Sequence, residues 1–211
     1  MSALDEFISS FSKYGGHALT NRFEVEINAP RQAIPEASSD RHVSFRVESF
    51  TMPGKNIRTV TNETVYGPTY EMAQGLTYAE DISMSFFLSA EHFEREYFLR
   101  WQDFVIKPNN YNLEYYKEYV RPINVFQLGK NGQRMAGLRL NECFPKTVGP
   151  LEMSSANIDI AKQEVSFVFK DFVFIDNSGQ VSQLTDNRSF SSSSPIPTDI
   201  FSLPKSFSNA I

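Results

Sequence analysis

The side chains that could catalyse a reaction or bind a metal are few and scattered in this chain. The three histidines, His17, His42 and His92, include no pair at metal-ligand spacing. The single cysteine, Cys143, has no histidine near it in the sequence, so a buried apolar role is favoured over a nucleophile. The sequence contains no phosphate-binding loop, dinucleotide glycine motif or nucleophile elbow. We therefore expect no enzyme activity, no cofactor and no metal site.

Two pairs of carboxylates are the remaining candidates for acid–base chemistry. Glu80 and Asp81 stand at the start of an expected strand, and Glu24 and Glu26 share one strand face. Paired carboxylates can act as general acid and base. A solvated strand face is the favoured interpretation of both pairs, and catalysis by residues that only the fold brings together stays open.

Composition narrows the class of protein further. The chain has 211 residues and a formal net charge of −5, and its Lys and Arg residues are dispersed, which argues against tight nucleic-acid binding. No apolar run approaches the roughly 18 residues of a membrane span, and no secretory signal pattern begins the sequence. The single cysteine favours folding in a reducing compartment. The 19 phenylalanines favour β structure, because aromatic side chains suit pleated, half-buried surfaces.

Alternating apolar residues predict a mainly β domain. Residues 22–28 show the pattern clearly, with Phe23, Val25 and Ile27 on one face. The same alternation predicts strands over residues 42–50 and 81–88. An Asn-Gly turn within residues 130–132 predicts a hairpin of the flanking runs, residues 122–128 and 134–144. The closing strands are expected over residues 165–169 and 172–174.

A helix is predicted over residues 91–106, where apolar side chains recur at helical spacing and Pro108 marks the end. Its aromatic face should pack on the sheet, with Trp101 buried between them. The expected core comprises Phe23, Phe45, Phe86, Phe98, Trp101, Phe104, Phe167 and Phe169.

Residues 48–67 differ from the other β segments because they lack a strong apolar face. Met52-Pro53-Gly54 signals a turn, and the following Thr and Val residues have strand propensity. Such a segment is typical of an edge or an extended hairpin that stays exposed or pairs with another chain.

The two ends of the chain lie outside this β pattern. Residues 2–13 predict a short amphipathic helix with Leu4, Phe7, Ile8 and Phe11 on one stripe, closed by Gly15-Gly16. Packing on its own domain is the favoured role of this stripe, and docking on a neighbouring subunit is the alternative. Residues 178–211 are rich in Ser and Pro, so we expect a domain over residues 1–177 followed by an extended C-terminal segment.

The ordered set of elements resembles the tail tube proteins of contractile-tailed bacteriophages. The likeness covers about residues 3–176 and rests on four segments. These are the N-terminal helix with the strand that follows it; Met52-Pro53-Gly54; the strand over residues 82–88 with the helix that contains Trp101-Gln102; and Phe144-Pro145-Lys146-Thr147-Val148-Gly149 followed by Gln163-Glu164-Val165-Ser166-Phe167.

The resemblance implies a small β-sandwich or barrel with a flanking helix, six copies of which join their sheets into a ring with a continuous inner barrel. Rings would stack into a virion tail tube, assembled in the host cytoplasm, that conducts DNA without gripping it. Sheath, baseplate and tail terminator proteins are the implied partners. We expect contacts between subunits or rings at Met52, Pro53, Gly54, Lys55, Asn56, Arg58, Asn62 and Glu63, and lumen positions at Glu24 and Glu26.

Two segments depart from the family pattern, namely the enlarged residues 107–121 and the Ser-rich tail. They leave a baseplate tube initiator, or the tube of a related injection system, as alternatives to the main tube. A soluble β-barrel that binds a small ligand or glycan is the alternative from another class, and an unrecognised hydrolase is a third. A ligand-binding barrel predicts a monomer with a closed pocket, whereas a tube protein predicts rings or filaments.

Overall fold

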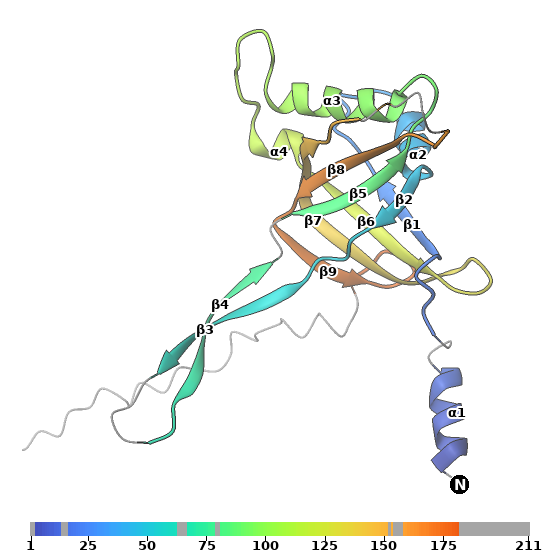
Figure 1. Ribbon diagram of the computed structural model, residues 1–211, viewed down its shortest axis with the longest axis vertical. Coiled ribbons are helices and arrows are strands. Elements are labelled where there is room, and N and C mark those ends of the chain that lie inside the picture. Colours follow the sequence, from blue (N-terminus) through green and yellow to red (C-terminus); the bar gives the residue numbers. More distant parts are fainter. Residues whose placement is uncertain are drawn as a thin grey trace, which may run out of the picture.

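The computed structural model describes residues 3–13, 17–62, 67–78, 81–151, 153 and 158–181 (Figure 1). The protein is mainly β, as predicted. Its helices and strands, in chain order, are α1 (Ala3–Lys13), β1 (Phe23–Ile27), α2 (Ala37–Ser44), β2 (Val47–Phe50), β3 (Lys55–Asn62), β4 (Tyr70–Tyr78), β5 (Ile82–Phe87), α3 (Phe93–Val105), α4 (Tyr116–Tyr119), β6 (Arg121–Leu128), β7 (Arg134–Val148), β8 (Lys162–Val168) and β9 (Asp171–Ile175).

The long strand β7 joins the two halves of the main sheet. Its first part pairs with β6 and β9, and its last part pairs with β8. Between these parts, Glu142 has a left-handed φ of 54° and the register with β6 shifts, which is typical of a bulge that bends a strand. The strand order is β1-β6-β7-β8-β5-β2, with β9 also on β7. The path therefore begins at β1 and ends at β2, and these two strands are not paired in the described part of the chain.

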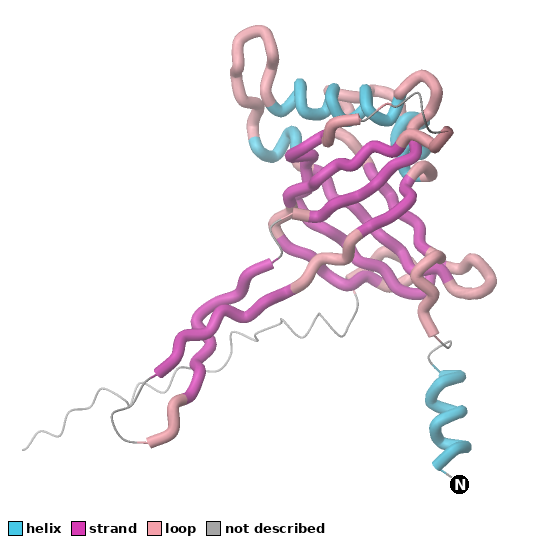
Figure 2. Tube along the Cα trace, viewed as in Figure 1, coloured by secondary structure: helices cyan, strands magenta, loops and turns pink. Residues whose placement is uncertain are grey.

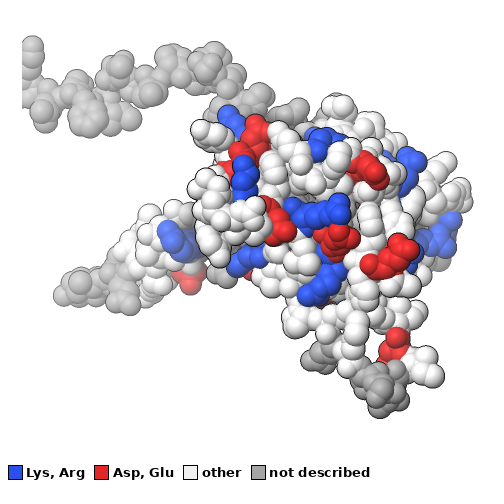
Figure 3. All heavy atoms as spheres, turned by 90° about the horizontal axis from the view of Figure 1, so that it is seen from above, with Lys and Arg blue, Asp and Glu red and all other residues white. Residues whose placement is uncertain are grey.

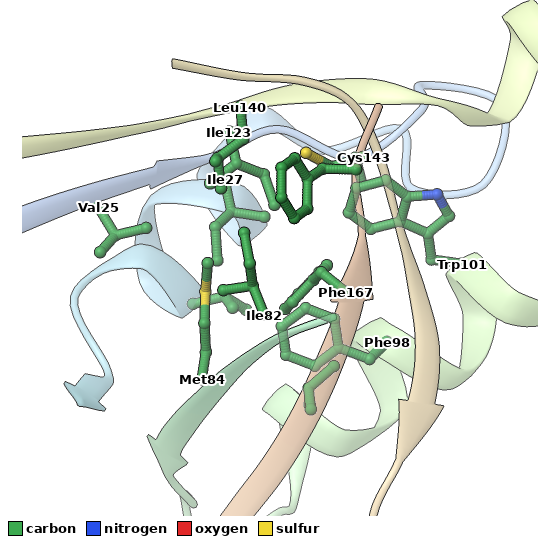
Figure 4. Packing of buried hydrophobic residues seen from close by; sticks show 14 of the residues in the cluster. Val25, Ile27, Ile82, Met84, Phe98, Trp101, Ile123, Leu140, Cys143 and Phe167 are labelled. Atoms are coloured by element: carbon green, nitrogen blue, oxygen red, sulfur yellow. The ribbon is translucent and has the colours of Figure 1, made fainter. Parts of the chain in front are cut away.

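The core fills the space between the bent sheet and α3 (Figure 4). Alternate residues of β5 and β8 point inward, including Ile82, Met84 and Phe167, each at most 1% exposed. Helix α3 adds Phe98 and Trp101, and the Trp101 Nε1 group donates to the backbone oxygen of Tyr119 at 2.9 Å. Of the residues expected in the core, those that are buried are Phe86, Phe98, Trp101, Phe167 and Phe169, and those that are partly buried against the core are Phe23 and Phe104.

The predicted strand over residues 42–50 is wrong in its first half. Residues 37–44 form helix α2, and strand β2 begins only at Val47. The helix is fixed by polar contacts, because Ser44 Oγ accepts from the Ile27 amide at 3.0 Å and Asp40 accepts from the Tyr97 hydroxyl at 2.6 Å. Phe45 follows the helix and is 74% exposed, so its placement in the core is also wrong.

Strands β3 and β4 form a separate two-stranded sheet that projects from the body of the molecule (Figures 1 and 2). This projecting hairpin agrees with the expected extended, exposed hairpin, but its limits differ. The expected segment was residues 48–67, whereas residues 48–50 belong to β2 in the main sheet and the second hairpin strand begins at Tyr70. In β4, Tyr70, Met72, Leu76 and Tyr78 recur at every second position, but Gln74 interrupts the series where the register with β3 shifts.

Helix α1 lies where it was predicted, but the side chains of its stripe are mostly exposed and not buried against the domain. The side chains of Leu4, Phe7 and Ile8 are 66%, 64% and 56% exposed. The helix stands away from the main sheet in Figure 2. Residues 14–16, with the expected glycine stop, and residues 182–211 of the expected tail lie outside the described residues. No described helix is both long and apolar enough to span a membrane.

Candidate assembly surfaces

The side chains considered for chemistry occupy separate places in the fold. His42 lies on α2, with its Nε2 atom 3.0 Å from Glu94 Oε1, and Asp81 pairs with Lys146 at 2.7 Å. Glu80 lies outside the described residues. Where the structure places residues, no three His, Cys, Asp or Glu side chains are grouped to hold a metal ion.

Buried polar groups in this region are held by structural contacts. Burial alone would raise the pKa of Glu94, but hydrogen bonds from the amide and hydroxyl of Ser89 and from His42 outweigh it and lower the pKa below its ordinary value. Burial raises the pKa of Cys143 to about 12, so its thiol stays protonated and unreactive at neutral pH. The contacts of Glu94 connect α2 with the start of α3.

The hairpin carries apolar side chains on both faces. Residues that pair directly across two strands share a face, so Ile57 with Leu76 lie on one face and Val60 with Met72 on the other. These four side chains are between 45% and 65% exposed. An isolated two-stranded sheet of this kind is marginal in water, so the hairpin has the properties of a contact surface.

The expected contact residues lie on this hairpin or at its base. Met52, Pro53 and Gly54 form the connection from β2 to β3, and Met52 is 60% exposed. The positions on β3 are Lys55, Asn56 and Arg58, which are exposed, and Asn62, which is partly buried. Glu63 lies outside the described residues. One surface element therefore brings together all of these positions that the structure describes.

Arg134 of the same chain forms hydrogen bonds with both Glu24 and Glu26. The Arg134 guanidinium donates to Glu24 through two nitrogens at 2.7 and 2.8 Å and to Glu26 at 2.5 Å. It also lies 4.1 Å from the centroid of the Phe126 ring. The hydrogen bonds that Arg134 donates to Glu24 lower the pKa of Glu24 and raise the pKa of Arg134. One guanidinium thus faces two carboxylates, so this carboxylate–arginine cluster keeps one uncompensated negative charge within a subunit.

Further charged side chains on the same outward face of the sheet are held by neutral partners. Arg139 donates to Asn124 at 3.0 Å and to the backbone oxygen of Gly179 at 3.0 Å. Asn141 donates to Asp171 at 2.6 Å. Figure 3 shows acidic and basic side chains interspersed on another face, at the helical end of the molecule. These hydrogen bonds fix the positions of Arg139 and Asp171 on the sheet.

Sequence reasoning missed Arg134 and Arg139. Both lie on β7, within a hairpin that the sequence did predict, and both are separated from β1 by more than 100 residues. The available signal was the alternation of β7, which places Arg139 and Asn141 on the face opposite Leu138 and Leu140. The pairing of β1 with β6 that completes the cluster is not visible in the sequence.

The outer edge of β1 is open to a groove beside α2. Arg22 accepts from the Leu128 amide of β6, whereas the Ile27 amide points the other way, to Ser44. Because backbone groups alternate along a strand, those of Phe23 and Val25 face away from β6. The groove has a volume of about 860 Å³ and is bordered by the exposed Phe45. This edge has the geometry to accept another strand.

Comparisons with known proteins agree with the structural class. The family described as "Phage tail tube protein" matches residues 18–175, which is most of the chain. This match confirms the resemblance drawn from the sequence. No curated protein matches the sequence.

Solved structures share the fold at low sequence identity. The tube–sheath complex of an extracellular contractile injection system ("PVC sheath-tube complex in extended state") has a TM-score of 0.55 at 11% identity and covers 83% of this chain and 99% of its own. The "PVC sheath/tube terminator in extended state" has a TM-score of 0.54 at 13% identity, covering 75% and 96%. The "anti-feeding prophage cap (AFP tube terminating cap)" has a TM-score of 0.54 at 12% identity, covering 76% and 91%.

Proposed function

The chain belongs to the phage tail tube protein family, and from this premise we propose that its copies close into hexameric rings that stack into a hollow tube. Its role in the tail tube is structural. The tube would form the inner conduit of a contractile tail and deliver DNA. The family assignment supports a structural rather than an enzymatic function.

The observation that supports this proposal is that one subunit leaves a strand edge and apolar hairpin side chains uncovered. The edge of β1 is open, and the hairpin exposes Ile57, Val60, Met72 and Leu76. Open edges and apolar hairpins promote association unless a partner covers them. In a ring of copies related by rotation, one surface of each subunit meets a different surface of the next, and every edge is covered.

The face with the carboxylate–arginine cluster is our candidate for the lumen wall. On the part of this face formed by β1, β7 and β9, the three carboxylates Glu24, Glu26 and Asp171 outnumber the two guanidinium groups of Arg134 and Arg139 by one. A wall of this kind repels a polyanion only weakly and does not bind it. It supports passage of DNA without retention.

The solved structures that share the fold supply candidate partners. Their names refer to a sheath, a tube terminator, a cap and a baseplate. We propose that this protein likewise assembles with sheath, terminator and baseplate proteins in a virion tail, after synthesis in the host cytoplasm. A tube initiator at the baseplate is the second candidate, because the enlarged residues 107–121 and the Ser-rich tail depart from the family pattern.

Electron microscopy tests the main proposal directly. We expect negatively stained purified protein to show rings at high concentration and tubes when a baseplate template is present. A ligand-binding barrel would instead remain monomeric. Light scattering that reports only monomers over a wide concentration range, with no polymer on any template, would overturn the proposal.

The role of the cluster is tested by Glu24→Gln and Glu26→Gln. If the cluster lines the lumen, the variants assemble normally and the tubes retain more DNA at low salt, because each substitution removes one negative charge that repels the phosphates. If the cluster lies in a subunit interface, assembly falls and tube length becomes more sensitive to ionic strength. Normal assembly with unchanged DNA retention contradicts both roles.

A further inference from the structure

Two elements of this protein have properties that call for a partner. Helix α1 has only 11 residues, and isolated helices shorter than about 12–15 residues are marginal in water. The projecting hairpin is a two-stranded sheet, which is also marginal alone. Both expose apolar side chains. The two elements can stabilise each other. A helix with one apolar stripe is stabilised when it packs on a sheet face, and a two-stranded sheet is stabilised when a helix covers it.

The two faces of the hairpin are not equivalent. Ile57 and Leu76 share their face with Tyr78, which turns back to the domain and contacts Phe169 and Phe172 at ring distances of 6.1 and 5.4 Å. The opposite face carries Val60, Met72 and Tyr70, which are 48%, 49% and 51% exposed. This second group, which we name the tip patch, offers the larger free apolar area.

Position favours contact between these two elements. Helix α1 and the hairpin both project from the end of the molecule opposite α3, and they do so on different sides (Figures 1 and 2). In a ring that joins one side of a subunit to the other side of the next, α1 would come beside a neighbour's hairpin in the same layer.

We propose that the apolar stripe of α1, formed by Leu4, Phe7 and Ile8, packs on the tip patch of the neighbouring copy within the same ring. The occupant of the tip patch is therefore a second copy of this chain. This inference rests on the proposed ring and identifies one of its contacts. It also gives a role to α1, which lies outside the family match.

Disulfide trapping tests the contact. The full-length Ile8→Cys/Val60→Cys variant, assembled and then oxidised, should form intermolecular disulfides, because the two positions would come within the Cα separation of about 7 Å that a disulfide allows. The matched control is Ile8→Cys/Ile57→Cys, which places the second thiol on the opposite face. We expect about tenfold less product from the control, because its thiols cannot meet that geometric limit. Cys143 is fully buried and should not react.

The size of the products separates the alternatives. A ladder that stops at the number of copies in one ring supports the proposal. Products larger than a ring indicate contact between rings, and equal yields from the two variants indicate no specific face; either result overturns it. If rings form but neither variant cross-links, α1 docks elsewhere and the proposed tube function stands. If no rings form with or without cysteines, the tube function fails and this inference fails with it.

Discussion

Strands β5 and β3 are both regular β structure, but their apolar side chains have different environments. Ile82 and Met84 of β5 are at most 1% exposed, whereas Ile57 and Val60 of β3 are 65% and 48% exposed. The apolar side chains of β5 are covered by other parts of the same chain. Strand β3 has regular hydrogen bonds to β4, but its apolar side chains are not covered. The contrast teaches that one chain contains a self-sufficient body and projecting elements that depend on assembly.

The largest effect is expected from the body. Trp101 is fully buried, and its indole nitrogen is bonded to Tyr119. Trp101→Ala should lower the free energy of unfolding by roughly 3–5 kcal/mol, because it opens a cavity and loses this hydrogen bond. Denaturant unfolding followed by circular dichroism measures the change. Leu99→Ala, at a 39% exposed site on the same helix, is the control and should have a much smaller effect. A loss below about 1 kcal/mol for Trp101→Ala would contradict the tight packing.

The contrast between body and projection also separates what the sequence predicts from what it does not. Alternation predicted β1, β5, β8 and the hairpin of β6 and β7, because each buries one face against its own core. It failed at α2, where Val43, Phe45 and Val47 alternate like a strand. There the contacts of Asp40 with Tyr97 and of Ser44 with Ile27 favour a helix. Both contacts join residues that are far apart in the sequence, so neither is apparent from it.

The candidate surfaces were predictable to a similar degree. The hairpin positions on β3 followed from strand propensity without an apolar face. The clamp of Arg134 on Glu24 did not, because it depends on strand pairing over a separation of 110 residues. The sequence periodicity of a polar strand face does not indicate which charged side chains will pair across strands.

A pair of glycines sharpens the comparison. A Cβ atom at Gly137, in β7, would lie 2.6 Å from Ile175 Cγ1 and 2.8 Å from Phe126 Cδ1, and both of those side chains are buried. Gly137→Ala should therefore cost roughly 1–3 kcal/mol of unfolding free energy through overpacking. Gly54, at the base of the hairpin, has no atom within 4 Å of the same position. Gly54→Ala should leave the melting temperature nearly unchanged. Equal costs at the two sites would show that body and projection do not differ in packing.

The hairpin should affect assembly and not folding. Val60→Asp places a charge in the exposed tip patch, where the monomer has room for it but a packed interface does not. We expect an unchanged melting temperature and a concentration for ring formation raised about tenfold or more, equivalent to about 1.4 kcal/mol. Thr61→Asp, one residue along on the other face, is the matched control. The separation of roles is wrong if Val60→Asp unfolds the monomer or assembles like the native chain.

The smallest effect concerns the polar face of the body. Because Arg134 lowers the pKa of Glu24 in the folded state, their interaction stabilises the protein fully above the ordinary Glu pKa of about 4.3. That stabilisation is lost as pH falls through the lowered folded-state pKa, since protonated Glu24 no longer attracts the guanidinium. Both side chains are about one third exposed, so solvent screening limits the coupling to less than about 1 kcal/mol. A double-mutant cycle of Glu24→Gln and Arg134→Gln, measured by urea unfolding, should give this coupling at pH 7 and progressively less as the pH falls through the folded-state pKa of Glu24. If the coupling persists in acid, the attraction does not depend on the Glu24 charge. If the coupling is already absent at pH 7, the cluster is held by the packing of Arg134 on Phe126, whose ring centroid lies 4.1 Å from the guanidinium carbon. The charges of the cluster would then matter to the assembled tube and not to the single subunit.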